Sequence, residues 1–250
     1  MEWTALPVGL VFASLATMVG IGGGILWTPY LIFVLGLSPA EAVLTSLIVQ
    51  VAGMGSGGLT VAVQNKTDPR VSLILAGAAF PGVAAGVWLS TVVPQQCVVF
   101  LLGVACLATA LVFVAAREDL GDAPVRKVPL RSIVPYLWPV PLLSTLTGLL
   151  SVGVGDFLVP ILRNRLNMRM DAAIGACLIL MAMNAAVASA LHIAGGETFS
   201  GRLVFIAALG VIAGGQIGPR IARRIPDQTL KEIFIYGLSL VGIHIVFNAF

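Results

Sequence analysis

The sequence predicts an all-α polytopic membrane protein built from two inverted repeats, and three observations lead to this fold class. Hydrophobic residues make up 58% of the 250 positions and charged residues only 10%, whereas charged residues are about 25% of an average soluble domain. Apolar stretches of membrane-spanning length recur along the whole chain. A glycine-interrupted motif occurs twice at a constant offset. These features exclude a soluble globular domain.

Eight apolar stretches follow one another along the chain, at residues 5–35, 39–64, 71–93, 96–116, 133–162, 170–193, 203–219 and 229–249. A crossing needs about 20 residues at a rise of about 1.5 Å each. Six stretches have the length of a single transmembrane helix. Residues 5–35 and 133–162 are too long for one straight crossing, and each is interrupted near its middle by glycines. We expect each of these two segments to consist of two half-helices that are too short to span alone.

The two long stretches contain the same motif, Gly20-Ile-Gly-Gly-Gly-Ile-Leu-Trp-Thr-Pro29 in the first and Ser151-Val-Gly-Val-Gly-Asp-Phe-Leu-Val-Pro160 in the second. Adding 131 to a position in the first copy gives its equivalent in the second, so that Gly22 matches Gly153, Gly24 matches Gly155 and Pro29 matches Pro160. Each half of the chain then holds one broken segment and three transmembrane helices. We expect an N-terminal repeat at residues 1–116, a cytoplasmic linker at 117–132 and a C-terminal repeat at 133–250.

The basic residues favour a re-entrant hairpin for residues 133–162. If all eight stretches crossed the membrane once, seven of the fourteen lysines and arginines would lie on each side, against the positive-inside rule. If residues 133–162 enter and leave on one side, thirteen lie on that side and only Arg202 on the other. The basic side is then cytoplasmic. The charges do not show whether residues 5–35 form a hairpin or cross the membrane, but the repeat favours a hairpin there too. Each half would then cross the membrane three times, so the two halves would be inverted relative to each other, as in many secondary transporters.

The glycine motifs predict a binding site for a small anion. A half-helix beginning near Ile25, and another near Asp156 or Phe157, directs free N–H groups and a positive dipole end at each break. Glycine lets a ligand approach the backbone and permits positive φ. Hydroxyl and amide side chains in the neighbouring stretches can donate further hydrogen bonds. The candidate substrate-binding residues are Gly20, Gly22, Gly23, Gly24, Thr45, Ser46, Gln50, Gly153, Gly155, Cys177 and Asn184, with Pro29 and Pro160 as structural residues.

Structural interpretations compete with these functional ones. The motif glycines can serve close helix packing, as we expect for the GxxxG-spaced Gly53, Gly57, Gly210, Gly214 and Gly218. The hydroxyls can bond to their own helix, and the amides can link neighbouring helices. Asp156 is either a proton-coupling carboxyl or a helix N-cap. The histidines, His192 and His244, more often bond within a helix bundle than carry protons.

The first copy of the motif also resembles a known family. The run GIGGGILWTPYLIFVLGLSPAEAVLTSL is similar to the TauE/SafE family of membrane transporters, through its glycine run and proline, Gly-Leu-Ser-Pro, and Ala42-Val-Leu-Thr-Ser46. The resemblance implies an integral membrane protein that moves small anions, notably sulfite or organosulfur compounds, usually outward. By this analogy Gly20, Gly22, Gly23, Gly24, Pro29, Thr45 and Ser46 line or shape the path. The second copy departs from the pattern at Val154, Asp156, Ala176 and Cys177.

We therefore expect a secondary transporter that exports a small anion, with proton coupling and self-association left open. A passive anion channel is the main alternative, and an intramembrane enzyme is disfavoured because GxSxG and HExxH motifs are absent. Cys97, Cys106 and Cys177 form no CxxC pair, and we expect no disulfide, metal or cofactor. Basic residues lie between apolar runs, which argues against nucleic acid as a partner. The expected location is the lipid bilayer of the bacterial cell membrane, as a multi-pass protein.

Overall fold

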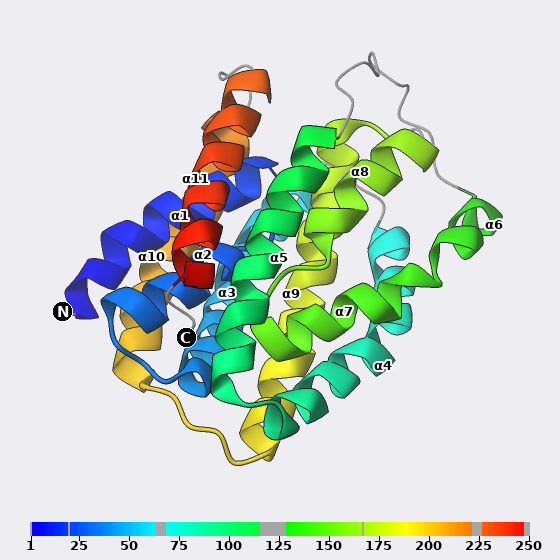
Figure 1. Ribbon diagram of the computed structural model, residues 1–250. Coiled ribbons are helices and arrows are strands. Elements are labelled where there is room, and N and C mark those ends of the chain that lie inside the picture. Colours follow the sequence, from blue (N-terminus) through cyan, green and yellow to red (C-terminus); the bar gives the residue numbers. More distant parts are fainter. Residues whose placement is uncertain are drawn as a thin grey trace.

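The computed structural model describes residues 2–19, 21–63, 69–115, 129–166, 168–221 and 227–247, which contain helices and no strand (Figure 1). The first half comprises the helices η1 (Glu2–Thr4), α1 (Ala5–Val19), α2 (Gly24–Pro29), the π-helix η2 (Tyr30–Val34), α3 (Pro39–Val63), α4 (Pro69–Val92) and α5 (Gln95–Ala115). The second half comprises α6 (Leu130–Ile133), η3 (Val134–Tyr136), α7 (Pro139–Leu150), α8 (Gly155–Leu166), α9 (Met170–Ala194), α10 (Gly201–Ile221) and α11 (Asp227–Phe247). The prediction of an all-α polytopic membrane protein is confirmed.

Helix lengths separate whole spans from broken segments. Five described helices are long and apolar enough to cross a membrane, namely Pro39–Val63, Pro69–Val92, Gln95–Val114, Ala172–Ala194 and Gly201–Gly218. These are five of the six single spans expected; in α11 the apolar part that the structure describes is the shorter Ile235–Phe247. The apolar helices Glu2–Met18, Gly24–Val34 and Pro139–Leu150 are also shorter than a span. Both glycine motifs therefore interrupt a helix, and the helices after the breaks begin at Gly24 and Gly155, within one residue of expectation.

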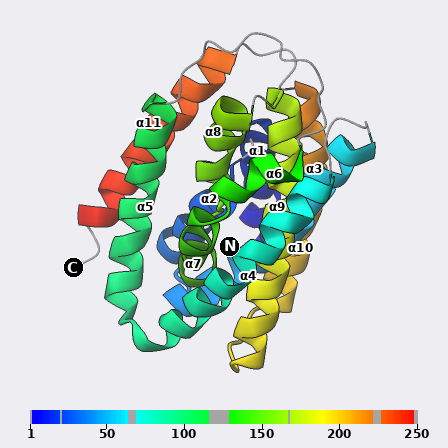
Figure 2. The same ribbon diagram turned by 90° about the vertical axis from the view of Figure 1, so that its right-hand side faces the viewer.

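The broken segments form the middle of three layers (Figure 2). The pair α5 and α11 lies at one edge, and α3, α4, α9 and α10 lie at the other. Between them, Met18, Ile21 and Ile25 of the first segment share an apolar cluster with Leu150 and Val152 of the second, together with residues of α5 and α11. In Figure 1 α2 runs back toward the N-terminal end of α1, and α8 turns back from the inner end of α7.

The helix contacts of one half are repeated in the other half when each helix is replaced by its equivalent 131 residues away. Helix α1 packs on α10, and its equivalent α7 packs on α4. Helix α2 packs on α3, and α8 packs on α9. The pairs α3 with α9 and α5 with α11 join equivalent helices of the two halves. A twofold relation between the repeats would produce this pattern, and their inversion across the membrane stays a prediction.

Small residues bring the first arm of each broken segment close to the other half of the chain. A Cβ added at Gly210 or Gly214 of α10 would overlap the carbonyl oxygen of Leu6 or Leu10 in α1. On the other side, α7 lies equally close to α4, at Gly82 and Gly86. Such contacts are typical of membrane helices, which associate through tight packing of small residues. The packing interpretation of the GxxxG-spaced Gly210 and Gly214 is therefore confirmed.

The segment before α7 differs from the expectation. The sequence predicted one continuous apolar stretch from residue 133, whereas α6 and η3 precede α7, which starts at Pro139. Pro135 and Pro139 explain the interruption, because a proline inside a helix removes a backbone hydrogen bond. Residues 117–128 of the expected linker lie outside the described residues, and the division into repeats and linker stays a prediction.

Candidate functional site

The two helix breaks lie against each other in the centre of the molecule. A Cβ placed on Gly24, the first residue of α2, would lie 1.8 Å from the carbonyl oxygen of Ser151 in the second break. A Cβ placed on Gly153 would lie 2.6 Å from the Cα of Gly22 in the first break. Real Cβ atoms essentially never approach other atoms closer than 3.0 Å. Glycine is therefore required at both positions because the two backbones touch.

The need for glycine here is steric, and the expectation that it also supplies positive φ is wrong for the described break glycines. The described glycines with positive φ are Gly36 and Gly196, which lie outside both breaks. The residue with positive φ at the breaks is Ser151, at φ 61° and ψ 14°, where it ends α7. A non-glycine residue in this left-handed conformation is strained. Its backbone N–H donates to the carbonyl of Thr147 at 3.0 Å, which fixes the turn.

Ser151 is the centre of a buried polar network. The amide nitrogen Nε2 of Gln50 donates to the Ser151 carbonyl oxygen at 2.9 Å and lies 2.6 Å from its Oγ. The Ser151 hydroxyl donates in turn to Oγ of Ser46 at 3.0 Å. Nearby, the hydroxyl of Thr147 donates to the carbonyl oxygen of Val152 at 2.8 Å. Helix α3 of the first half thus holds the break of the second half by hydrogen bonds.

The two breaks meet their neighbouring helices in equivalent ways but with different chemistry. A Cβ on Gly24 would lie 2.5 Å from Nε2 of Gln50 in α3. A Cβ on Gly155, the equivalent residue, would lie 2.6 Å from the sulfur of Met181 in α9 and 3.2 Å from Cβ of Cys177. Met181 is the repeat equivalent of Gln50. The site therefore has a hydrogen-bonding wall on α3 and a thioether and thiol wall on α9.

Several buried polar atoms around this network have no hydrogen-bond partner. Oγ1 of Thr45, Oε1 of Gln50 and Nδ2 of Asn184 are unpaired, and these three residues are at most 3% exposed. Thr45 adjoins Ser46 on α3, and Asn184 lies one turn beyond Met181 on α9. A buried polar group without a partner destabilises a fold by about 1–3 kcal/mol. Such groups beside a helix break indicate a place where a polar ligand can bind.

The electrostatics of the site come from the backbone. Among the side chains that the structure describes, the buried polar ones are hydroxyls, the amides of Gln50 and Asn184, and His192. No lysine or arginine is among them. The helices that begin at Gly24 and Gly155 each place the positive end of a dipole at the breaks. A small anion would find N–H and O–H donors here without having to displace a carboxylate among the described side chains.

Comparison with known proteins agrees with this architecture. The family model described as sulfite exporter TauE/SafE matches residues 5–245, which include both breaks and all the helices around them. The chain belongs to the TauE/SafE family. It is similar to the probable membrane transporter protein YunE of Bacillus subtilis (strain 168), with 21% identity over 266 aligned positions that cover 96% of each chain. No solved structure matches the chain.

In this TauE/SafE membrane transporter, most of the predicted site residues come together. The structure brings to the paired breaks Gly22, Gly23, Gly24, Ser46, Gln50, Gly153, Gly155 and Cys177. Thr45 and Asn184 are buried on the same two helices. The Gln50 amide nitrogen, expected to donate to a substrate, instead donates to Ser151. Gly20 and the side chains of Asp156 and Pro160 lie outside the described parts; the backbone of Asp156 is the second residue of α8, one position past the start of the helix.

Pro29 acts on the helix after the first break. It is the last residue of α2, and the chain continues as the π-helix η2. Because proline has no N–H, it leaves the carbonyl of Ile25 without its usual helical partner. The Cys106 thiol of α5 points at that carbonyl oxygen, with Sγ 4.0 Å away. Pro29 is thus the last residue of the regular α-helix, about one and a half turns beyond the break, and its structural role stays a prediction.

Sequence reasoning missed Ser151 and Met181 as site residues. Ser151 was visible in the motif, at the position where the first copy has Gly20, and a hydroxyl in place of a glycine beside an expected break is a signal for a hydrogen-bonding residue. Met181 was visible only as the repeat equivalent of Gln50. Neither residue type by itself indicates a site, because methionine and serine are common in membrane helices.

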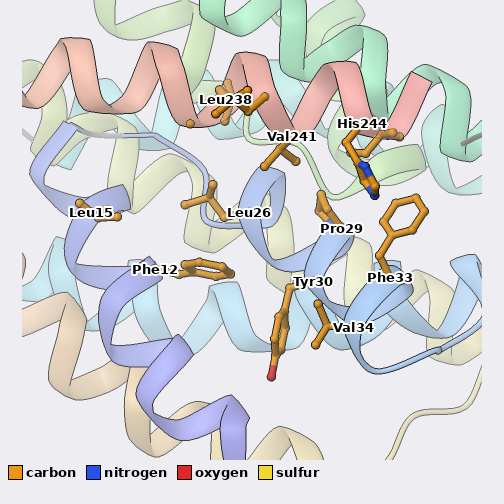
Figure 3. A pocket seen from close by; sticks show the side chains of 13 residues that line it. Phe12, Leu15, Leu26, Pro29, Tyr30, Phe33, Val34, Leu238, Val241 and His244 are labelled. Atoms are coloured by element: carbon orange, nitrogen blue, oxygen red, sulfur yellow. The ribbon is translucent and has the colours of Figure 1, made fainter. Parts of the chain in front are cut away.

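Two pockets of the TauE/SafE protein lie away from the breaks. One, of about 570 Å³, is lined by apolar side chains of α1, α2, η2 and α11, together with Tyr30 and His244 (Figure 3). The Tyr30 hydroxyl lies 2.6 Å from Oγ1 of Thr4, and the ring of His244 meets that of Phe33 edge to face. The other, of about 660 Å³, lies between α3 and α10 and includes Arg220. The apolar pocket offers few donors to an anion, whereas the pocket with Arg220 also contains Ser56, Thr60 and Gln216 and does offer donors.

Proposed function

We propose that this TauE/SafE protein is a secondary transporter that moves a small anion, sulfite or an organosulfur compound, out of the cell through the site formed by its two helix breaks. The family is described as a sulfite exporter family, and the relative in Bacillus subtilis carries the name of a probable membrane transporter. Sulfite and sulfonates present several acceptor oxygens on one small group. They match a site made of N–H and O–H donors.

The contact between Gly24 and Ser151 carries this proposal. It brings the start of α2 against Ser151, the residue that ends α7 and leads into the second break, at a buried point within the middle layer. Broken helices that face each other at mid-depth are the arrangement in which transporters bind anions at helix N-termini. The unpaired Nδ2 of Asn184 and Oγ1 of Thr45 are the side-chain donors that a substrate would engage.

Substrate entry would have to part the Gln50 amide from Ser151. Gln50 and Ser46 come from α3, whereas Ser151 belongs to the broken segment α7–α8. The bonds therefore join two bodies that can move relative to each other in alternating access. In the state described here the hydrogen bonds close the site, and a substrate oxygen would replace the Ser151 oxygen as the acceptor for Gln50 Nε2.

A flux assay with purified protein in liposomes tests the proposal. Efflux of sulfite, sulfate, thiosulfate and small sulfonates is measured with and without an opposing gradient and with and without a proton gradient. Accumulation against the substrate gradient supports a secondary transporter, whereas flux that only follows the gradient supports a passive channel. No flux of any of these anions contradicts the proposal.

The coupling role of Asp156 is a separate proposal. A carboxyl in the first turn of α8 is favoured by the helix dipole, and it can still bind a proton when an anion enters beside it. Asp156→Asn should remove any proton dependence that this carboxyl supplies, measured as flux of a permanently charged sulfonate against pH. If the pH profile is that of the wild type, the coupling role is excluded.

A further inference from the structure

His192 connects the end of α9 to the carbonyl end of the broken helix α7. Its side chain is buried, and its Nε2 lies 2.8 Å from the carbonyl oxygen of Gly148. On the other edge of the ring, Nδ1 lies 3.1 Å from Oε2 of Glu197. Glu197 lies in the turn that follows α9, where Gly196 has φ 91°. The backbone N–H of Glu197 donates to the His192 carbonyl oxygen at 3.2 Å, which holds the turn against the histidine.

The Gly148 carbonyl needs a partner because α7 stops short. In an uninterrupted helix it would accept from the N–H four residues later, but α7 ends at Leu150 and Ser151 turns into the left-handed conformation. The Ser151 N–H donates to the carbonyl oxygen of Thr147, not to that of Gly148. The His192 ring satisfies Gly148, so it acts as a side-chain cap on the helix end that leads into the break.

Hydrogen-bond geometry fixes where protons must be in this group. A carbonyl oxygen only accepts, so Nε2 of His192 carries a hydrogen. If the ring is neutral, Nδ1 then carries no hydrogen, and Oε2 of Glu197 lies 3.1 Å away without a hydrogen-bond partner. The contact is favourable as an ion pair, which needs a second proton on the ring, as imidazolium with carboxylate. Loss of that proton removes the ion pair.

We propose that His192 and Glu197 form a proton-binding site that stabilises the capped end of α7, so that protonation favours the closed arrangement of the second break. An imidazolium at a helix C-terminus also interacts favourably with the helix dipole. The Glu197 side chain is 24% exposed, although its Oε2, the atom nearest His192, is buried. The site itself does not depend on transport; its effect on flux rests on the function proposed above.

Most other ionisable residues of the helices that contact α9 lie far from this pair. Helix α7 has none, and α1 has none. Helix α4 meets Gly148 at Val83. Arg70 lies 13 residues before Val83 on the same helix, a distance of about 20 Å. On α8 the ionisable residues are Asp156, Arg163 and Arg165, and α8 meets α9 near Cys177, about 22 Å from His192 along the helix. On α9 itself Asp171 lies at the far end.

Arg202 follows Glu197 by five residues and pairs with Glu2, and Glu41 is the ionisable residue of α3. It precedes Val43, which packs in one cluster with Ala188 and Leu191 of α9. The backbone N–H of Glu41 donates to the Ser38 hydroxyl oxygen at 3.3 Å, which caps the start of α3. No hydrogen bond links Glu41 to His192 or Glu197 among the described residues. Glu41→Gln therefore serves as the matched carboxyl control for Glu197→Gln.

Melting of the purified protein in detergent between about pH 5 and pH 8.5 tests the site without any substrate. We expect the wild type to lose at least about 3 °C on going to the higher pH, because loss of the ring proton removes the ion pair. In Glu197→Gln the ion pair is absent at both values, so this variant should melt at the same temperature at both. His192→Gln should also lose the pH dependence, and Glu41→Gln should retain it. A pH dependence that persists in both His192→Gln and Glu197→Gln overturns the proposal.

Nitrogen-15 NMR gives a readout that remains useful even if one variant fails to fold. The chain has two histidines, His192 and His244, so one variant assigns both. Below the transition His192 should carry hydrogens on both ring nitrogens. A neutral ring with hydrogen only on Nδ1 would overturn the proposal.

Flux then separates this proposal from the proposed function. Sulfonate, which keeps its charge over this pH range, is the transported probe. In liposomes the pH dependence of sulfonate flux should be lost in Glu197→Gln and kept in Glu41→Gln. If no anion is transported but the melting and NMR results hold, the proton site stands and the transport proposal fails. If sulfonate flux in Glu197→Gln keeps the wild-type pH profile, the link from this site to transport is refuted.

Discussion

Adding one methyl group at Gly24 should separate the two helix breaks. In Gly24→Ala the new Cβ would lie 1.8 Å from the Ser151 carbonyl oxygen, and this distance must grow by about 1.2 Å to reach the 3.0 Å limit. A shift of this size takes Ser151 out of hydrogen-bonding distance of Gln50, whose Nε2 now lies at 2.9 and 2.6 Å from its two oxygens. Backbone strain at Gly24 itself contributes nothing, because its φ is not positive.

The expected loss of stability follows from those broken contacts. Overpacking destabilises by about 1–3 kcal/mol, and a buried polar group left unpaired by about 1–3 kcal/mol. The sum, about 2–6 kcal/mol, corresponds to a decrease of roughly 4–24 °C in melting temperature for a chain of this size. Flux through the site should be abolished, because the two breaks no longer meet. The assays are thermal unfolding in detergent and anion efflux from liposomes.

Two glycine variants are matched controls for the same added methyl group. In Gly23→Ala, the neighbouring residue, the nearest atom to the new Cβ is the flexible Met54 Cε at 3.2 Å. In Gly77→Ala on α4 the new Cβ meets nothing within 4 Å, and alanine favours the helix. Both should insert and melt near the wild-type temperature, and Gly77→Ala, which lies outside the site, should also transport. If Gly24→Ala melts like these controls and transports like Gly77→Ala, the close contact of the breaks is not required and the reasoning is wrong.

Three further predictions concern Ser151, Asn184 and the topology. Ser151→Gly should be more stable than Ser151→Ala by about 1–2 kcal/mol in unfolding experiments, because both lose the hydroxyl but only alanine keeps the strain of positive φ; equal stability would mean that the strain is negligible. Asn184→Leu removes an unpaired buried amide, so its melting temperature should be unchanged or higher while the apparent affinity for the anion falls; unchanged affinity would exclude Asn184 from the site. In a Cys97→Ser background, single cysteines at residues 121–128 and 163–169 should react with an impermeant reagent from the same side, and labelling from opposite sides would refute the hairpin.

The sequence predicted the helix breaks because their cause is local. Composition and span length define a membrane protein, and a glycine run in apolar sequence weakens a helix where it stands. The start of α2 at Gly24 and of α8 at Gly155 follows from this local chemistry, as does the end of the regular helix at Pro29. The repeat offset then predicted which residues would be equivalent, and the pairing of Gly24 with Gln50 and of Gly155 with Met181 follows it.

The sequence could not show which partners the polar residues choose. Gln50 is 101 positions from Ser151, and either a substrate or a neighbouring backbone could have used its amide. The positive φ of Ser151 was equally hidden, because a serine enters that conformation only when the surrounding structure imposes it. The link from His192 to Gly148 also depends on how α9 lies against α7.

The sequence by itself thus determined the membrane class, the family and the position of both helix breaks, since hydropathy, span length and glycine content act along the chain. The contact between the breaks, the link from Ser151 to α3 and the His192 cap on α7 depend on how the helices pack together. These contacts join residues from different halves of the chain. Their geometry is set by close packing of whole helices through small residues, which no local pattern encodes.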